Sequence, residues 1–291
     1  MGIKLDAETW DRAVEVADGF WVIAAQHRPG YSKHMPVINN RVLVFRLTEN
    51  GKPVLVVVNG LAESAIAEVQ RISSETGLPV TYNISPGGGH HVTLDRWHEA
   101  FSTATTLVGP TRIPRTTNGQ KLMKLPRVRT MDAADPLPMF KGQLDAVLFD
   151  GLLGFRDNLT VKEGGKQLSA FGQMLMMMKE MPPKDPTDEL WLCHVSTGTV
   201  IGGENLGWIL TPEALKTMPF MFRMMMKPMT VYVMDGPRKV SDKAKVAGHW
   251  KAILSWPAST VMTYHDPPGV AFVGDGRAAL EAAARKVKQV A

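Results

Sequence analysis

Three short stretches of the sequence contain side chains that could do chemistry, and each follows a segment that is typical of a β-strand. The first is a glycine-rich loop that ends in His90 and His91, the second contains Glu204, and the third contains His265 and Asp266. Imidazole and carboxylate groups bind transition metals, and they also donate and accept protons near neutral pH. These residue types therefore suit either a metal centre or metal-free acid–base catalysis.

Each stretch also has a purely structural interpretation. His90 and His91 could stabilise their loop, and Glu204 could cap a loop or form a salt bridge. Adjacent histidines tend to point their side chains in different directions, so we do not expect both to bind one metal ion. The three glycines at 87–89 suit a tight turn, although they would also let a ligand or an anion approach the backbone.

Alternating strands and helices would position the first of these loops. Two apolar, β-branched segments flank Asn50-Gly51, which is a hairpin turn signal. The next segment has a helical period and ends at Gly77, a suitable C-cap. The predicted strands of the first half are 41–47, 53–58, 79–84 and 105–109, and the predicted helices are 63–76 and 94–101.

The second half has the same mixture of strands and helices. Between the halves, residues 110–138 are rich in Pro, Thr, Arg and Lys and lack a clear period, so we expect a long irregular excursion there. Interleaved hairpins and helices predict a mixed α/β fold whose sheets are covered by helices on their outer faces. The predicted strands are 144–150, 189–195, 199–203, 230–234 and 260–264, and the predicted helices are 168–181, 241–256, 274–290 and one that begins at Thr211-Pro212.

The composition is that of a globular protein, with 44% hydrophobic residues, 21% charged residues and a formal net charge of +5. Because Lys and Arg are scattered, we expect no nucleic-acid partner. The single cysteine, Cys193, excludes an intrachain disulfide and favours the reducing cytoplasm. No apolar run reaches the roughly 18 residues of a transmembrane helix, and the N-terminus lacks the apolar region of a signal peptide. We therefore expect a cytoplasmic protein with a single domain over residues 1–291.

Four sequence landmarks, in this order, resemble the metallo-β-lactamase superfamily. They are RVLVFRL…GKPVLVVVNGL with the TGLPVTYNI that follows, the glycine loop before LDRWHEAFSTATTLVGP, the hairpin ELWLCHVSTGTVIGGENLGW, and WKAILSWPASTVMTYHDPPG. The resemblance extends from Arg41 to Ala284 and is to a divergent branch whose metal motif is eroded. It implies a four-layer αββα sandwich.

The resemblance also implies a set of ligands. The superfamily has an HxHxDH motif after the first helix and its following strand, and here only His90 or His91 of that motif is present. Glu204 stands where the family has a metal-bridging aspartate, and His265 matches the last histidine ligand. No histidine occupies the ligand position near the start of the second hairpin. The implied site is therefore reduced to His90, Glu204 and His265, which would hold a single zinc, iron or manganese ion or no metal at all.

Methionine is unusually frequent: the chain has 18, of which 11 lie in the predicted helical segments 168–181 and 211–229. Methionine side chains adapt to irregular apolar partners. Because they surround the predicted helices rather than follow one stripe, we expect a small apolar ligand or a homodimer contact beside them. Contact with a membrane surface and ordinary core packing are the alternatives. Cys193, His194 and His249 are expected to be structural.

The reaction that the resemblance implies is hydrolysis of an ester or lactone, which we expect here to act on a small apolar molecule with a reduced or absent metal site. His90 and His265 would be ligands or acid–base groups, and Glu204 would be the carboxylate ligand or base. Asp266 could orient its neighbour His265. Two alternatives stay open: a non-catalytic ligand-binding protein on a degenerate enzyme fold, and a metal-independent lyase or isomerase in which His and Glu transfer protons.

Overall fold

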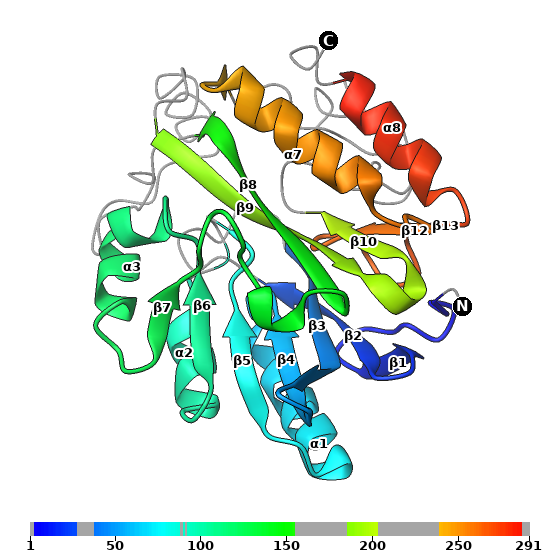
Figure 1. Cartoon of the computed structure of the whole chain (residues 1–291). Coiled ribbons are helices and arrows are strands. Elements are labelled where there is room, and N and C mark those ends of the chain that lie inside the picture. Colours follow the sequence, from blue (N-terminus) through cyan, green and yellow to red (C-terminus); the bar gives the residue numbers. More distant parts are fainter. Residues whose placement is uncertain are drawn as a thin grey trace, which may run out of the picture.

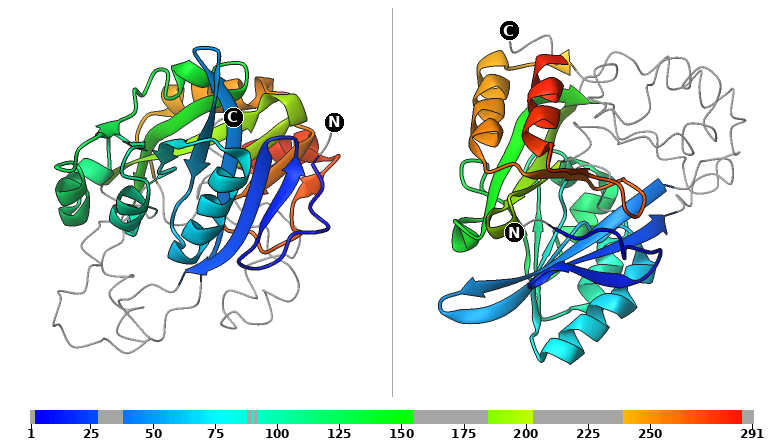
Figure 2. Two further views of the ribbon diagram at one scale, coloured as in Figure 1. Left: turned by 90° about the horizontal axis from the view of Figure 1, so that it is seen from below. Right: turned by 90° about the vertical axis from the view of Figure 1, so that its right-hand side faces the viewer.

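Two β-sheets pack face to face in this chain, and helices cover the outer face of each sheet (Figure 1). The view from the side shows the resulting order of layers, helix, sheet, sheet and helix (Figure 2). This is the four-layer αββα arrangement that the sequence predicts. The computed structural model describes residues 3–27, 38–87, 90, 92–154, 185–202 and 239–286.

Within the described residues, the first sheet has seven strands in the order of the sequence. Its first four strands are antiparallel, and the last three run parallel to the fourth. The strands are β1 (Ala13–Ala17), β2 (Phe20–His27), β3 (Ile38–Glu49), β4 (Lys52–Val58), β5 (Val80–Ile84), β6 (Thr105–Val108) and β7 (Val128–Thr130), and the covering helices are α1 (Ile66–Thr76), α2 (Leu94–Ala100) and α3 (Thr117–Leu122).

The second sheet has the strand order β11-β8-β9-β10-β12-β13 within the described part of the chain. The pair β10 and β12 is parallel, and its other strand pairs are antiparallel. The strands are β8 (Leu144–Gly154), β9 (Asp185–His194), β10 (Thr199–Gly202), β11 (Lys239–Val240), β12 (Thr260–Thr263) and β13 (Phe272–Val273), and the covering helices are α7 (Lys243–Ser255) and α8 (Gly276–Lys286).

Strand periodicity divides the apolar side chains among three core layers. In β3, Leu43 and Phe45 pack between the two sheets, whereas Val44 packs under the helices of the first sheet. In β9, Leu192 lies between the sheets and Trp191 lies under α7 and α8. Successive side chains of a strand point to opposite faces, so an apolar strand covered on both faces contributes to two layers at once.

Several predicted elements are confirmed by the structure. The hairpin of β3 and β4 turns at Asn50 and Gly51, which have φ angles of 51° and 76°. Such left-handed backbone is what makes Asn-Gly a hairpin turn. Helix α1 ends at the predicted C-cap Gly77, whose φ is 67°. The predicted strand and helix at 260–264 and 241–256 correspond to β12 and α7.

Two parts of the chain differ from the prediction. Strands β1 and β2 were not predicted. Strand β2 is a continuous apolar run buried from Phe20 to Ala25, and periodicity alone does not distinguish such a run in a strand from one in a buried helix. The segment 110–138, expected to be irregular, contains α3 and β7. Helix α3 has six residues, too few to show a helical period in the sequence, although Thr116 caps it by accepting a hydrogen bond from Gly119 N at 2.8 Å. The elements predicted at 168–181, 211–229 and 230–234 lie outside the described residues.

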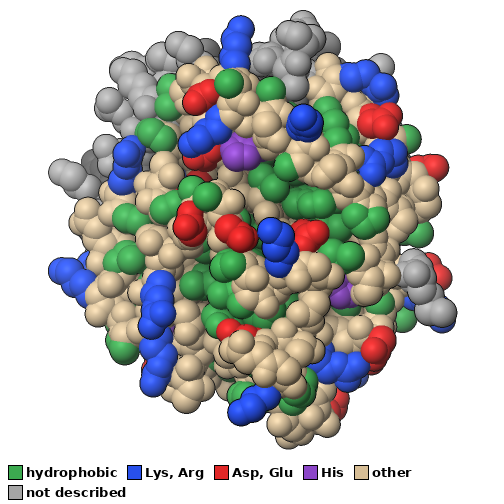
Figure 3. Space-filling model, in the orientation of Figure 1, with side chains coloured by type: hydrophobic (Ala, Val, Ile, Leu, Met, Phe, Trp, Pro, Cys, Tyr) green, Lys and Arg blue, Asp and Glu red, His purple; other side chains and the backbone are tan. Residues whose placement is uncertain are grey.

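The distribution of surface charge and the environment of Cys193 agree with what the sequence predicts. Acidic and basic side chains are interspersed over the face in Figure 3. None of the helices in the described ranges is long and apolar enough to cross a membrane. Cys193 is buried, and burial raises the pKa of its thiol to about 12. The thiol is therefore protonated at neutral pH and unreactive, as predicted.

His194 ends β9 between the two sheets, in an apolar environment. Its ring lies against Phe20 and Phe45, with ring centroids 5.1 and 5.4 Å away, and its Nδ1 is 2.9 Å from Thr197 Oγ1. Burial lowers the pKa of His194 from 6.5 to about 4. The folded protein thus keeps this imidazole neutral at a pH where the unfolded chain protonates it.

We predict that His194 makes the protein less stable as the pH falls from 6.5 towards 4. Over this window the unfolded chain binds a proton that the folded chain excludes, which removes about 3 kcal/mol at most from the free energy of unfolding. Above pH 6.5 the contribution is constant. Urea unfolding at several pH values should show a shallower decline in His194→Gln than in the parent protein. Parallel pH profiles for the two proteins would contradict this account.

Candidate functional site

Four segments meet where the two sheets face each other at one end. They are the start of β3, Asn59 after β4, the loop after β5 that ends at His90, and the residues after β12. Backbone hydrogen bonds join them in pairs: Arg41 N donates to Tyr264 O at 2.8 Å, and Asn59 N donates to Ile84 O at 2.9 Å. Residues that are far apart in the sequence are therefore fixed next to one another.

His90 and His265 lie side by side at this junction. Their ring centroids are 4.9 Å apart, and the rings are inclined by 34°. Both are buried, with exposed fractions of 2% and 8%. The structure thus brings together two of the residues that the sequence singles out, one from each sheet. His91 and Glu204, which the sequence also singles out, lie outside the described residues.

Asn59 fixes the orientation of the His90 ring. The Asn59 Nδ2 group donates to Arg41 O at 2.7 Å and points to Tyr264 O at 3.5 Å. A flipped amide would place its oxygen against two carbonyl oxygens, so Oδ1 must face His90 Nδ1, its hydrogen-bonding partner. Because Oδ1 can only accept, His90 Nδ1 carries the hydrogen. Asn59 holds this position with a φ of 68°, in the left-handed region that asparagine tolerates.

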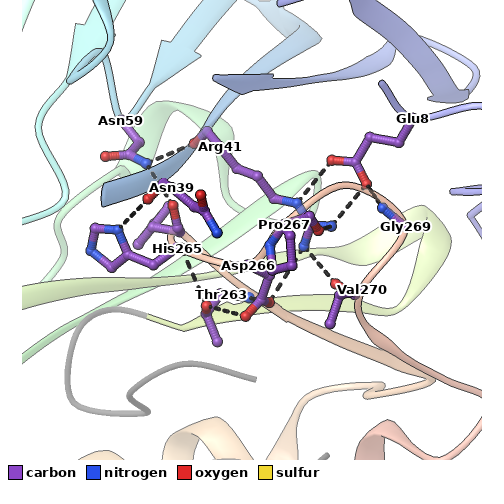
Figure 4. Close-up of polar contacts among 11 residues, drawn as sticks. Glu8, Asn39, Arg41, Asn59, Thr263, His265, Asp266, Pro267, Gly269 and Val270 are labelled. Carbon is purple, nitrogen blue, oxygen red and sulfur yellow. Dashed lines mark hydrogen bonds and ion pairs between the residues drawn. The ribbon is translucent and has the colours of Figure 1, made fainter. Parts of the chain in front are cut away.

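A backbone carbonyl fixes the orientation of the His265 ring in the same way. His265 Nδ1 lies 2.8 Å from Asn39 O, which can only accept a hydrogen bond, so Nδ1 is again the donor (Figure 4). In a neutral imidazole whose Nδ1 bears the hydrogen, the lone pair lies on Nε2. The two rings therefore form a matched pair in which Nε2 is the basic nitrogen.

The carboxylate of Asp266 bonds to Thr263 and Arg41. It accepts hydrogen bonds from Thr263 N at 2.7 Å and Thr263 Oγ1 at 2.8 Å, and it forms an ion pair with Arg41 Nη1 at 3.4 Å. Figure 4 shows this carboxylate on the side of the loop that faces Arg41. The Asn39 carbonyl is the partner of His265 Nδ1, and the role of Asp266 in orienting His265 stays a prediction.

Two buried acidic residues of β9, Asp188 and Glu189, lie beside the start of the glycine loop that leads to His90. Gly87 forms a β-bridge with Glu189, and Leu190 N donates to Pro86 O at 2.5 Å. Asp188 accepts a hydrogen bond from Thr111 N at 2.6 Å, and burial raises its pKa. Neither residue stands out in the sequence, because acidic residues near the start of a strand are usually exposed.

His27 is a further imidazole near the site that the sequence analysis missed. It ends β2, and its pKa is lowered first by burial, with a further lowering from the charge of His90 and an opposing effect from Glu63. Such coupling requires His27 to lie near His90. The sequence feature that could have identified it is its position just after the apolar run 20–25, at the same end of the sheet as the predicted site.

The described residues do not by themselves make a complete metal centre. A catalytic zinc site uses three protein ligands, of which His90 and His265 could supply two imidazole nitrogens. No group of three or more His, Cys, Asp or Glu side chains suited to a metal occurs within the described ranges.

Known structures match the fold over nearly the whole chain, whereas sequence comparisons find nothing. No protein-family model and no curated protein sequence matches the chain. A metallo-β-lactamase from Erythrobacter litoralis, with β-mercaptoethanol in its active site, is 12% identical over 95% of this chain and 96% of that chain, with a TM-score of 0.55.

Two further structures are similar to a comparable degree. The metallo-β-lactamase FIM-1 from Pseudomonas aeruginosa in its mono-zinc form is 10% identical over 98% of both chains, with a TM-score of 0.51. A beta-lactamase domain protein from Burkholderia ambifaria is 13% identical over 98% of this chain and 76% of that chain, also with a TM-score of 0.51. The chain therefore has the metallo-β-lactamase fold, as its sequence landmarks predict. At this level of identity the likeness establishes the fold alone.

We predict that Asn59→Gly destabilises the protein by about 2 kcal/mol, because it removes buried hydrogen bonds to two carbonyls and to His90. Glycine tolerates the positive φ, so the loss reports on the side chain rather than on backbone strain. Asn50→Gly is the matched control, since Asn50 also has a positive φ but lies exposed in a turn. Urea unfolding should show a change within about 0.5 kcal/mol for the control. Equal losses in both variants would contradict the role of Asn59.

Proposed function

We propose that this protein is a hydrolase that uses His90 and His265 as an acid–base pair to cleave an ester or lactone. The observation that carries the proposal is the pairing of two buried imidazoles whose Nδ1 groups both donate hydrogen bonds. The metallo-β-lactamase fold supports it, because the fold places strand-end loops around a common site. The apolar character of the substrate is proposed from the methionine-rich segments.

The reaction follows from the two Nε2 nitrogens. One neutral imidazole accepts a proton from water as the water oxygen attacks the ester carbonyl. The second, when protonated, donates its proton to the leaving alkoxide as the carbon–oxygen bond breaks. Ester and water become acid and alcohol, and proton exchange with solvent restores the pair. Positioned acid–base groups of this kind contribute about 10²- to 10⁴-fold to the rate.

The proposal does not depend on a metal. If Glu204 joined His90 and His265, the three side chains would form the ligand set that the sequence resemblance implies, and the ion would polarise water or the carbonyl. The described donors alone fall short of that set, so the steps above use only the imidazoles.

Activity measurements on esters and lactones of graded chain length test this proposal. We expect His90→Gln and His265→Gln each to lower kcat/KM by about 10²- to 10⁴-fold. His249→Gln is the control, because His249 lies on α7 and pairs with Asp150 at 2.8 Å, away from the junction. It should retain full activity.

Two further outcomes decide between the alternatives. Activity that survives both substitutions would overturn the proposal. Turnover in H₂¹⁸O should place ¹⁸O in the acid product. A reaction that depends on His90 and His265 but gives a product without ¹⁸O would favour the lyase or isomerase. Elemental analysis of protein prepared without chelators, together with assays after chelation, separates the metal-free pair from a metal-dependent one.

A further inference from the structure

A fully buried cluster of charged side chains lies directly beside His265. Arg41 donates to Glu8 through Nε and Nη2, at 2.9 and 2.8 Å, and its Nη1 lies 3.4 Å from Asp266 Oδ2. The side chains of all three residues have no exposed surface. Figure 4 shows the guanidinium between the two carboxylates. Buried charges are costly unless they are paired and hydrogen-bonded, so this cluster is held firmly in one geometry.

Arg41 and Glu8 also form hydrogen bonds with the backbone of the loop that follows His265. Arg41 also donates to Pro267 O and Val270 O, both at 2.8 Å. Gly269 N donates to Glu8 Oε2 at 2.7 Å. The loop that follows His265 is therefore bonded to the guanidinium and to its partner carboxylate at several points.

The backbone of Arg41 contacts the other side of the same site. Its N–H donates to Tyr264 O, the carbonyl just before His265, and its own carbonyl accepts a hydrogen bond from Asn59 Nδ2. Arg41 thus holds the residues on both sides of His265, and through Asn59 it reaches the ring of His90.

We propose that Arg41, together with Glu8 and Asp266, is a positioning residue that fixes His265 against Asn39 and beside His90. The cluster holds the loop on which His265 lies, so that Nδ1 keeps its hydrogen bond to the carbonyl and Nε2 keeps its direction. The catalytic consequence rests on the proposed function, whereas the effect on the His265 ring does not.

A purely structural role would leave the ring unaffected. Buried ion pairs are often replaceable by apolar groups without loss of a unique fold. In that case a folded variant would be less stable but would keep the His265 hydrogen bond. A positioning role requires the ring to change in a protein that is still folded.

Arg41→Lys tests this distinction, because one ammonium cannot reproduce the several bonds of the guanidinium. Arg46→Lys is the matched control, since Arg46 lies on the same strand and its ion pair with Asp18 is exposed. The readout is the imidazole Nδ1–H signal of His265 in NMR spectra, assigned by its loss in His265→Gln. We expect its exchange with solvent to be at least about tenfold faster in Arg41→Lys and unchanged in Arg46→Lys.

A second variant covers the case in which Arg41→Lys does not fold. Asp266→Asn keeps the Glu8–Arg41 pair and removes the negative charge beside Arg41 Nη1, so the ion pair between the loop after His265 and the guanidinium is lost. The same faster exchange is expected. An unchanged His265 Nδ1–H signal in the folded variants would overturn the proposal.

Measurements of kcat and KM separate this inference from the proposed function. If the protein hydrolyses esters, Arg41→Lys should lower kcat about tenfold and leave KM within about twofold, because ring position affects the transition state more than binding. Faster exchange in a protein without esterase activity would support positioning and refute the hydrolase.

Discussion

The burial of Arg41 constrains the rest of this structure. Moving a guanidinium out of water costs several kcal/mol, on the order of what a whole domain retains as net stability, unless opposite charges and carbonyl oxygens surround it. Glu8 and Asp266 supply the charges, and they lie 33 and 225 residues away along the chain. The N-terminal segment, β3 and the loop after β12 must therefore meet at one point. The two sheets are tied together there by more than apolar contact.

That junction determines what the histidines can do. Asn59 holds His90 through its amide oxygen, and the Asn39 carbonyl holds His265, so each ring is oriented by a group that can only accept a hydrogen bond. The tautomer of each neutral ring follows from this geometry and not from sequence. Two imidazoles with matching tautomers, buried side by side, are better suited to proton transfer than a single histidine would be. The fold contributes by bringing one ring from each sheet.

Local patterns in the sequence predicted the elements, and long-range order along the chain predicted part of the site. The β3–β4 hairpin followed from Asn50-Gly51, because few other residue pairs adopt two consecutive left-handed conformations. The positions of His90 and His265 at strand ends predicted that they would lie near one another. The environment of Arg41 could not be predicted, because its position in an apolar strand gives no sign of partners so distant in sequence. The short helix α3 was missed for the opposite reason, since its signal is confined to a single cap at Thr116.

The proposed acid–base pair depends most directly on where the imidazole hydrogens are. Neutron diffraction from deuterated crystals at pH 8, where imidazoles are ordinarily neutral, would locate them. We expect deuterium on Nδ1 of both His90 and His265, with the rings beside each other, and none on either Nε2. Deuterium on Nε2 of either ring, or rings that face separate surroundings, would contradict it.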